Sequence, residues 1–129
     1  MLDTNVLVSI LVFDSQLLKE MLLKITDNYT LVLSSYILNE LRDVIERKFQ
    51  NKKIALDIFL SQLPFEMYYI SNSFSIDKTY NIRDKNDILI LYSAIKSKSN
   101  ILITGDKDFD NIRLKNIKIM TPREFIDKY

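Results

Sequence analysis

The chain has 129 residues, of which 47% are hydrophobic, and its 18 basic and 17 acidic residues leave a formal charge of +1. It contains no cysteine and no histidine, which excludes disulfides and thiolate catalysis and removes the commonest general base and the usual zinc ligands. No apolar stretch approaches the roughly 18 residues of a membrane span, and no secretory signal pattern opens the chain. We therefore expect one cytoplasmic domain, residues 1–129, with a buried core and no membrane partner.

The first half of the chain predicts strands that alternate with helices. Helices are expected where apolar residues recur three and four positions apart, and strands where a short apolar run lies between polar residues. Pro64 ends the last helix of this half. In chain order we expect a short strand beginning at Leu2, helices over residues 6–13 and 16–25, a strand over 30–34, and helices over 37–45 and 52–63.

The second half continues the alternation. Thr121-Pro122-Arg123-Glu124 combines an N-cap, a proline at the first helical position and a capping-box glutamate, and it marks the start of a C-terminal helix. Alternating strands and helices predict the α/β class, a three-layer α/β/α sandwich around a mainly parallel sheet of about five strands. Before that helix we expect a strand over residues 67–70, a polar connection over 71–84, a helix over 86–97, and strands over 101–104 and 117–120.

Two of the predicted strands end in aspartate. Asp3 follows the first apolar run, and Asp106 follows the later run immediately after Gly105, the only glycine. The carboxyl ends of parallel strands meet at one edge of a sheet, where open α/β folds place their chemistry. Glu40 borders the apolar stripe of its helix and Asp87 opens another helix, so all four carboxylates can converge above that edge.

A group of four carboxylates predicts a metal ion. At separations of about 5 Å each pair would repel by about 3 kcal/mol at an effective dielectric near 20. Oxygen ligands favour Mg²⁺ or Mn²⁺, which lower the pKa of a coordinated water and neutralise charge on a phosphodiester. Asn5 and Thr104 would position ligands or substrate by hydrogen bonding, and Gly105 would let the backbone bend or approach a phosphate closely.

These acids also have structural explanations. Asp84 or Asn86 can cap the helix that follows, and Asp87 can be a first-turn acid favoured by the helix dipole. Glu40 can be a surface acid. Asp3, within an apolar run, is harder to explain in this way.

Basic residues gather around one predicted helical segment. A charge run of this kind is either a solvated face or a nucleic-acid contact, and the sequence leaves both open. Three of these residues, Arg42, Lys48 and Lys52, are our candidate contacts to a nucleic-acid backbone. The full set is Arg42, Arg47, Lys48, Lys52 and Lys53.

Four short segments stand out along the chain, at residues 2–9, 34–41, 83–87 and 102–109. In order and spacing, along nearly the whole chain, they resemble the motifs of PIN-domain nucleases. Any one of them is weak, whereas four in sequence are specific. More narrowly, the chain resembles the bacterial and archaeal toxins of toxin–antitoxin systems that are related to VapC.

This resemblance implies an Mg²⁺- or Mn²⁺-dependent endoribonuclease with a five-stranded parallel α/β fold. Such proteins are commonly homodimers and are often inhibited by an antitoxin protein encoded beside them. RNA hydrolysis would leave a 5′-phosphate and a 3′-hydroxyl. The acidic quartet of metal ligands and catalytic carboxylates is matched by Asp3, Glu40, Asp87 and Asp106. Auxiliary positions are matched by Asn5, Thr104, Asp84 as a rival of Asp87, and Asp108 or Asp110, which can alternatively cap or solvate a short turn.

The chain departs from the family pattern in two places. Family members usually carry a residue or more before the first strand, whereas Met1 immediately precedes Leu2, which indicates a frayed strand or a start farther upstream. Residues 96–100 replace a turn that is commonly rich in alanine and glycine. Both departures concern local geometry more than chemistry.

Two other function classes compete with a ribonuclease. One is a non-catalytic module of the same fold that binds RNA or a protein, against which the intact acidic quartet argues. The other is a metal-dependent phosphohydrolase or a phosphoacceptor, but Thr4-Asn5 after Asp3 lacks the second aspartate of the haloacid dehalogenase pattern. Apolar residues of the early helices, Phe13, Leu17 and Met21, either supply a dimer surface or belong to the core.

Overall fold

The computed structural model describes residues 1–71 and 84–129. Its helices are α1 (Thr4–Val12), α2 (Gln16–Asn28), α3 (Ser35–Lys48), α4 (Lys53–Gln62), α5 (Lys85–Lys96) and α6 (Pro122–Lys128). Its strands are β1 (Val32–Ser34), β2 (Glu66–Tyr68), β3 (Ile101–Ile103) and β4 (Lys118–Met120). Short 3₁₀ turns cover Gln50–Lys52 and Lys107–Phe109.

The strands pair in parallel, as the alternation of elements predicts. β1 pairs with β2, with Leu33 opposite Met67, and β3 pairs with β4, with Leu102 opposite Ile119. The expected first strand is a single parallel bridge between Leu2 and Ile103. Backbone bonds from the Asp3 amide to the Ile103 carbonyl, and from the Ile103 amide to the Met1 carbonyl, both 3.0 Å, hold that bridge. The α/β class with parallel pairing is confirmed, and each strand is only three residues long.

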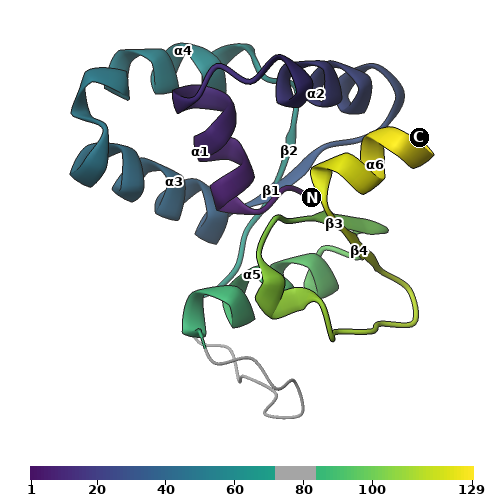
Figure 1. The fold of residues 1–129 in the computed structure, drawn as a ribbon. Helices are drawn as coiled ribbons and strands as arrows, with labels where there is room; N and C mark the ends of the chain where they lie inside the picture. The colour runs from purple at the N-terminus through teal and green to yellow at the C-terminus, as the bar shows by residue number, and fades with distance from the viewer. Residues whose placement is uncertain (72–83) are drawn as a thin grey trace.

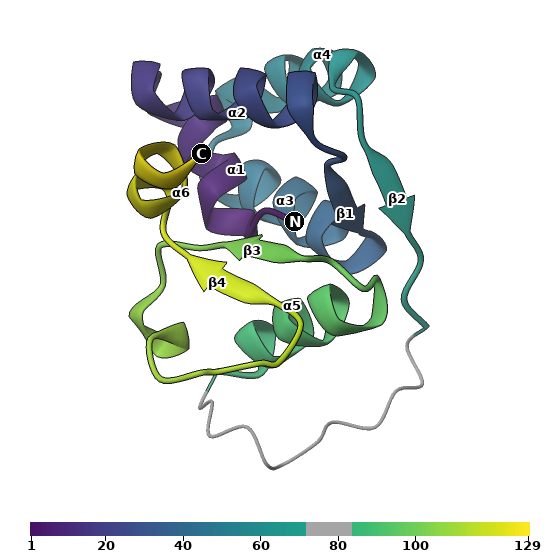
Figure 2. The same ribbon diagram turned by 90° about the vertical axis from the view of Figure 1, so that its right-hand side faces the viewer.

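Helices cover both sides of the β3–β4 pair. Figures 1 and 2 place α5 on one side of it and α1 and α6 on the other. α3 contacts α1, α4 and α5, and α6 packs on α2. The layers bring the start of α1, the start of α5 and the loop after β3 to one edge.

The core runs continuously between these layers. Burying a large apolar side chain such as leucine, isoleucine or phenylalanine contributes about 1.5–3 kcal/mol to the stability of the fold. The chain's early apolar residues divide between core and surface, because Met21 is buried, Leu17 is partly exposed and Phe13 is 66% exposed. The largest fully buried side chains are Leu2, Leu7, Met21, Leu33, Ile37, Leu41, Ile45, Ile90, Leu91, Leu102, Phe109 and Phe125.

Local capping explains where most helices begin. Ser15 accepts a hydrogen bond from the Leu18 amide, and the predicted capping box is confirmed by reciprocal bonds between Thr121 and Glu124. α1 begins at Thr4, earlier than expected, with Asp3 at its N-cap position. Apart from its end residues 71 and 84, the predicted polar connection lies outside the described residues. None of the helices described is both long and apolar enough to cross a membrane.

Candidate metal centre

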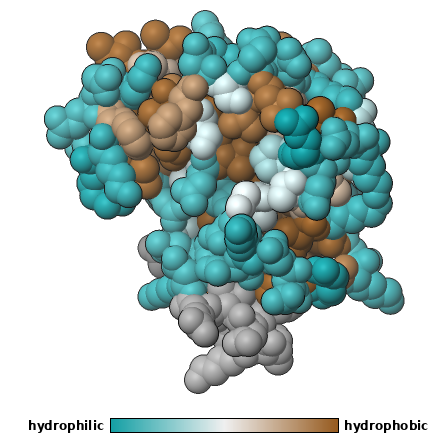
Figure 3. Space-filling view, viewed as in Figure 1, coloured by the Kyte–Doolittle hydropathy of each residue, from teal (hydrophilic) through white to brown (hydrophobic). Residues whose placement is uncertain are grey.

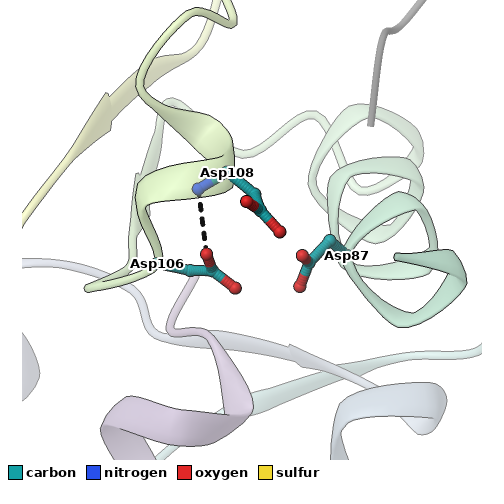
Figure 4. A group of neighbouring side chains, drawn as sticks. All are labelled: Asp87, Asp106 and Asp108. Carbon is teal, nitrogen blue, oxygen red and sulfur yellow. Dashed lines mark hydrogen bonds between the residues drawn. The ribbon is translucent and has the colours of Figure 1, made fainter. Parts of the chain in front are cut away.

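Three carboxylates converge at the edge formed by α5 and the loop after β3. Asp87, Asp106 and Asp108 each offer one oxygen, and these oxygens all lie within 4.8 Å of one another. Figure 4 shows Asp87 pointing from α5 toward the two other carboxyl groups. Asp87 is buried, Asp106 is half-buried and Asp108 is exposed, so the group opens to solvent on one side.

The loop after β3 is folded by its own aspartates. Asp106 is the N-cap of the Lys107–Phe109 turn, and its Oδ1 accepts a hydrogen bond of 2.9 Å from the Asp108 amide. Phe109 is buried in the core and anchors the turn. The spacing of two between Asp106 and Asp108 thus places both carboxyl groups on the side that faces α5.

Thr104 links this loop to the start of the chain. Its Oγ1 donates a 2.7 Å hydrogen bond to Oδ2 of Asp3 and accepts a 3.1 Å bond from the Asp106 amide. Asp3 and Thr104 are both buried. Among side chains, Thr104 holds the Asp3 carboxylate, and the backbone amides of Asn5 and Thr4 also favour its charged form.

We expect Thr104→Val to weaken both stability and metal binding. Valine keeps the volume of threonine but leaves Oδ2 of Asp3 and the Asp106 amide without their partner, which costs about 1–3 kcal/mol of unfolding free energy. Urea denaturation measures this loss. Thr26→Val, which removes a hydroxyl that forms a solvent-exposed hydrogen bond to the Leu23 carbonyl within α2, is the matched control. Equal stability of the two variants would contradict the linking role of Thr104.

Asp87 lies where a negative charge on its carboxylate is unfavourable. Burial, then the negative charge of Asp106 and a hydrogen bond with Asp108, raise the pKa of Asp87 from 3.8 to about 8, and the charges of Asp84 and Asp3 act in the same direction. Its Oδ2 is buried and has no hydrogen-bond partner. An unpaired buried oxygen among like charges is costly unless a cation balances it.

The surroundings of Asp3 also disfavour a negative charge on its carboxylate. Burial raises the pKa of Asp3, the hydrogen bond from Thr104 opposes that rise, and the negative charge of Glu40 adds to it. Asp3 thus lies within electrostatic reach of Glu40 and Asp87, but it does not belong to the 4.8 Å group. The donor set, all oxygen with one buried orphan, fits Mg²⁺ or Mn²⁺.

Glu40 approaches the centre from α3 and is also outside the 4.8 Å group. Its Oε2 accepts a 2.5 Å hydrogen bond from the Tyr36 hydroxyl, which lies 2.7 Å from Oδ1 of Asn86 on α5. Sequence reasoning missed Tyr36. The signal was present, because a tyrosine four residues before Glu40 lies on the same face of a helix.

A buried pair of hydroxyls ties the two helices together behind the acids. Ser93 on α5 lies 2.8 Å from Ser34, the N-cap of α3, and also 2.8 Å from the Leu89 carbonyl. Ser34 in turn accepts a bond from the Ile37 amide. Ser93 was also missed, although a serine in the apolar stripe of a helix indicates a buried polar contact.

The structure separates the two rival acids. Asp84 is the exposed N-cap of α5 and accepts a 2.8 Å bond from the Asn86 amide, as one structural explanation supposed. Asp87 joins the carboxylate group. Asp110 ends the 3₁₀ turn, and its carbonyl accepts a bond from Arg113. It lines a surface hollow that Thr104, Asp106 and Arg113 also border.

Asn5 and Gly105 lie beside the centre. Together with Asp106 they line a shallow hollow of about 270 Å³. Gly105 does not have a positive φ, and a Cβ built on it would meet nothing within 4 Å. The backbone bend therefore does not require glycine, whereas the open space on this side leaves room for close approach by a ligand.

The basic residues lie along the far part of α3 and the segment after it. Arg42 and Lys48 are exposed, and Lys52 is partly exposed. Two other members form exposed ion pairs, Arg47 with Asp43 at 3.1 Å and Lys53 with Glu46 at 3.8 Å. Helical spacing turns Arg42 about 200° away from Glu40, so its side of α3 differs from that of the acid.

A family model for the PIN domain matches residues 1–108 of this chain. The chain therefore belongs to the PIN domain family, as the four sequence motifs predicted. No curated protein matches it in sequence. Among solved structures it is similar to a chain in the crystal structure of VapBC2 from Rickettsia felis bound to a DNA fragment from their promoter. The two are 26% identical, the match covers 94% of this chain and 96% of the other, and the TM-score is 0.74.

Proposed function

We propose that this protein is a divalent-metal-dependent endoribonuclease and the toxin of a toxin–antitoxin pair. The observation that carries the proposal is the convergence of Asp87, Asp106 and Asp108, with a buried Asp87 oxygen that has no partner. The family supports nuclease chemistry, and the similarity to VapBC2 supports an antitoxin protein as partner. The proposal includes a single domain, a homodimer and a cytoplasmic location.

Each acid has a role in this proposal. Asp87 and Asp106 would hold Mg²⁺ or Mn²⁺ together with Asp3 and Glu40, and Asp108 would be the auxiliary acid. An ion held there would lower the pKa of a coordinated water and neutralise charge on the phosphodiester. Thr104 keeps the Asp3 carboxylate oriented, and the exposed side of the carboxylate group admits substrate.

The protein's response to Mn²⁺ tests the proposal. We expect Mn²⁺ to raise the melting temperature by mass action, and more strongly at pH 8.5 than at pH 6.5, because the ion displaces a proton from Asp87, whose pKa is raised to about 8. Labelled RNA should be cleaved only when Mn²⁺ or Mg²⁺ is present. EDTA should abolish both effects.

Two outcomes would contradict it. A melting temperature that does not respond to Mn²⁺ at either pH would favour a non-catalytic module of the same fold. Hydrolysis of a phosphatase reporter without cleavage of RNA would favour a phosphohydrolase.

The predicted contacts of Arg42, Lys48 and Lys52 with RNA remain part of the proposal. Replacement of these residues by glutamine should weaken RNA binding, and the loss should be largest at low salt.

A further inference from the structure

Tyr36 lies between two helices at the border of the carboxylate group. It is in the first turn of α3, and its hydroxyl is 2.5 Å from Oε2 of Glu40, four residues later on the same helix. The same hydroxyl is 2.7 Å from Oδ1 of Asn86 on α5. Asn86 is adjacent in sequence to Asp87, so Tyr36 connects one proposed metal ligand with the neighbour of another.

The number of protons fixes the direction of this chain of hydrogen bonds. A tyrosine hydroxyl has one proton, so it can donate to only one of the two oxygens. The carboxylate of Glu40 accepts only, whereas the Asn86 amide can turn and donate through its Nδ2. The consistent arrangement runs from the Asn86 amide to the Tyr36 hydroxyl and from that hydroxyl to Glu40. In this arrangement Tyr36 donates to Oε2 of Glu40, and Oε1 of Glu40 has no bond to Tyr36.

Tyr36 keeps its proton near neutral pH, because a phenolic hydroxyl ordinarily loses it only at about pH 10. The hydroxyl therefore remains a donor over the whole working range. A donor fixed on one oxygen of a carboxylate limits the orientations of the other oxygen.

We propose that Tyr36 is a positioning residue of the metal centre, holding the Glu40 carboxylate at a fixed orientation relative to α5. This inference rests on the proposed function, because it assigns Glu40 to the metal. Neither the sequence motifs nor the family match assigns a role to this position. α3 and α5 are already joined by the Ser34–Ser93 contact and by packing, so the Tyr36 hydroxyl is not needed to hold the helices together.

Tyr36→Phe is the informative variant, since it removes the hydroxyl and keeps the ring. We expect the apparent Kd for Mn²⁺, measured by calorimetry, to rise about 10-fold, as for other partners that orient ligands. The melting temperature in EDTA should stay within about 2 °C of wild type. Saturating Mn²⁺ should restore most of the RNA cleavage rate, and the unchanged melting temperature in EDTA distinguishes this loss of affinity from damage to the fold. Tyr69→Phe, at a tyrosine that is 71% exposed, is the matched control.

A second readout needs no metal. In the metal-free protein the side-chain amide resonances of Asn86 should shift in Tyr36→Phe and stay in place in Tyr69→Phe. Asn86→Ala should weaken Mn²⁺ binding in the same direction as Tyr36→Phe but less, because Tyr36 still donates to Glu40. This variant also keeps the test decisive if Tyr36→Phe folds poorly.

The outcomes separate this inference from the proposed function. If wild type and Tyr36→Phe bind Mn²⁺ equally and both cleave RNA, the role of Tyr36 is wrong and the nuclease proposal stands. A loss of melting temperature in EDTA that accompanies the loss of affinity, with Asn86→Ala binding as wild type does, would assign Tyr36 to the fold and overturn the inference. Absence of Mn²⁺ binding in wild type would overturn both proposals.

Discussion

Asp87→Asn is expected to abolish metal-dependent cleavage and, at the same time, to stabilise the metal-free protein at pH 8. Burial, the charge of Asp106 and the hydrogen bond with Asp108 raise the pKa of Asp87 to about 8, against an ordinary value of 3.8. Between these values the folded chain binds a proton that the unfolded chain does not, so stability falls as the pH rises through this window. Asparagine has no carboxyl proton to lose and avoids that cost.

Thermal melts in EDTA from pH 4 to pH 8.5 measure this difference. Asp87→Asn and wild type should melt alike near pH 4, and the variant should melt at least about 3 °C higher at pH 8. Mn²⁺ should then stabilise wild type and have little effect on the variant. Asp57→Asn, at an exposed aspartate of α4, is the control. A stability difference that is independent of pH would contradict the electrostatic explanation.

Asp3→Asn is expected to eliminate Mn²⁺-dependent RNA cleavage without unfolding the chain. Asp3 is only 1% exposed and accepts the Thr104 hydroxyl at 2.7 Å. Asparagine presents an oxygen of the same geometry to Thr104, so the bond and the fold survive, but the charge that a divalent ion requires is gone. We expect the cleavage rate with labelled RNA to fall at least about 100-fold.

The control for this substitution is Asp27→Asn, at an exposed aspartate near the end of α2. It should cleave as wild type does. Undiminished cleavage by Asp3→Asn would remove Asp3 from the proposed metal site. A melting temperature of Asp3→Asn in EDTA that equals or exceeds that of wild type would show that any loss of activity is chemical.

Much of the fold follows from local patterns. The alternation of strands and helices predicted parallel pairing, and Thr121 with Glu124 marked the start of α6. The extent of the strands could not be predicted in this way, because each ladder ends where neighbouring backbone groups stop meeting. The strand expected from Leu2 is therefore one bridge to Ile103, a result that depends on residues about a hundred positions away.

Local patterns also predicted part of the candidate site, and the rest depends on tertiary packing. The end of an apolar run located Asp106, and helix position made Asp87 a candidate. Whether Asp84 or Asp87 enters the group depends on how α5 packs, which no local pattern contains. Asp108 belongs to the carboxylate group because Oδ1 of Asp106 accepts a hydrogen bond from the Asp108 amide and so shapes the turn.

Contacts between distant segments were beyond sequence reasoning. Tyr36 meets Asn86 fifty positions later, and Ser34 meets Ser93. The sequence indicates such contacts only through a polar residue on an otherwise apolar or acidic face of a helix. Thr104 was predicted to act by hydrogen bonding, but its double role toward Asp3 and Asp106 depends on the register of the Leu2 bridge.

The bond between Asp3 and Thr104 spans 101 positions of the chain. Translation must therefore deliver β3 before the carboxylates can assemble, because Asp106 and Asp108 follow that strand. If the protein is the toxin that we propose, this order of synthesis would postpone its activity until nearly the whole polypeptide has emerged.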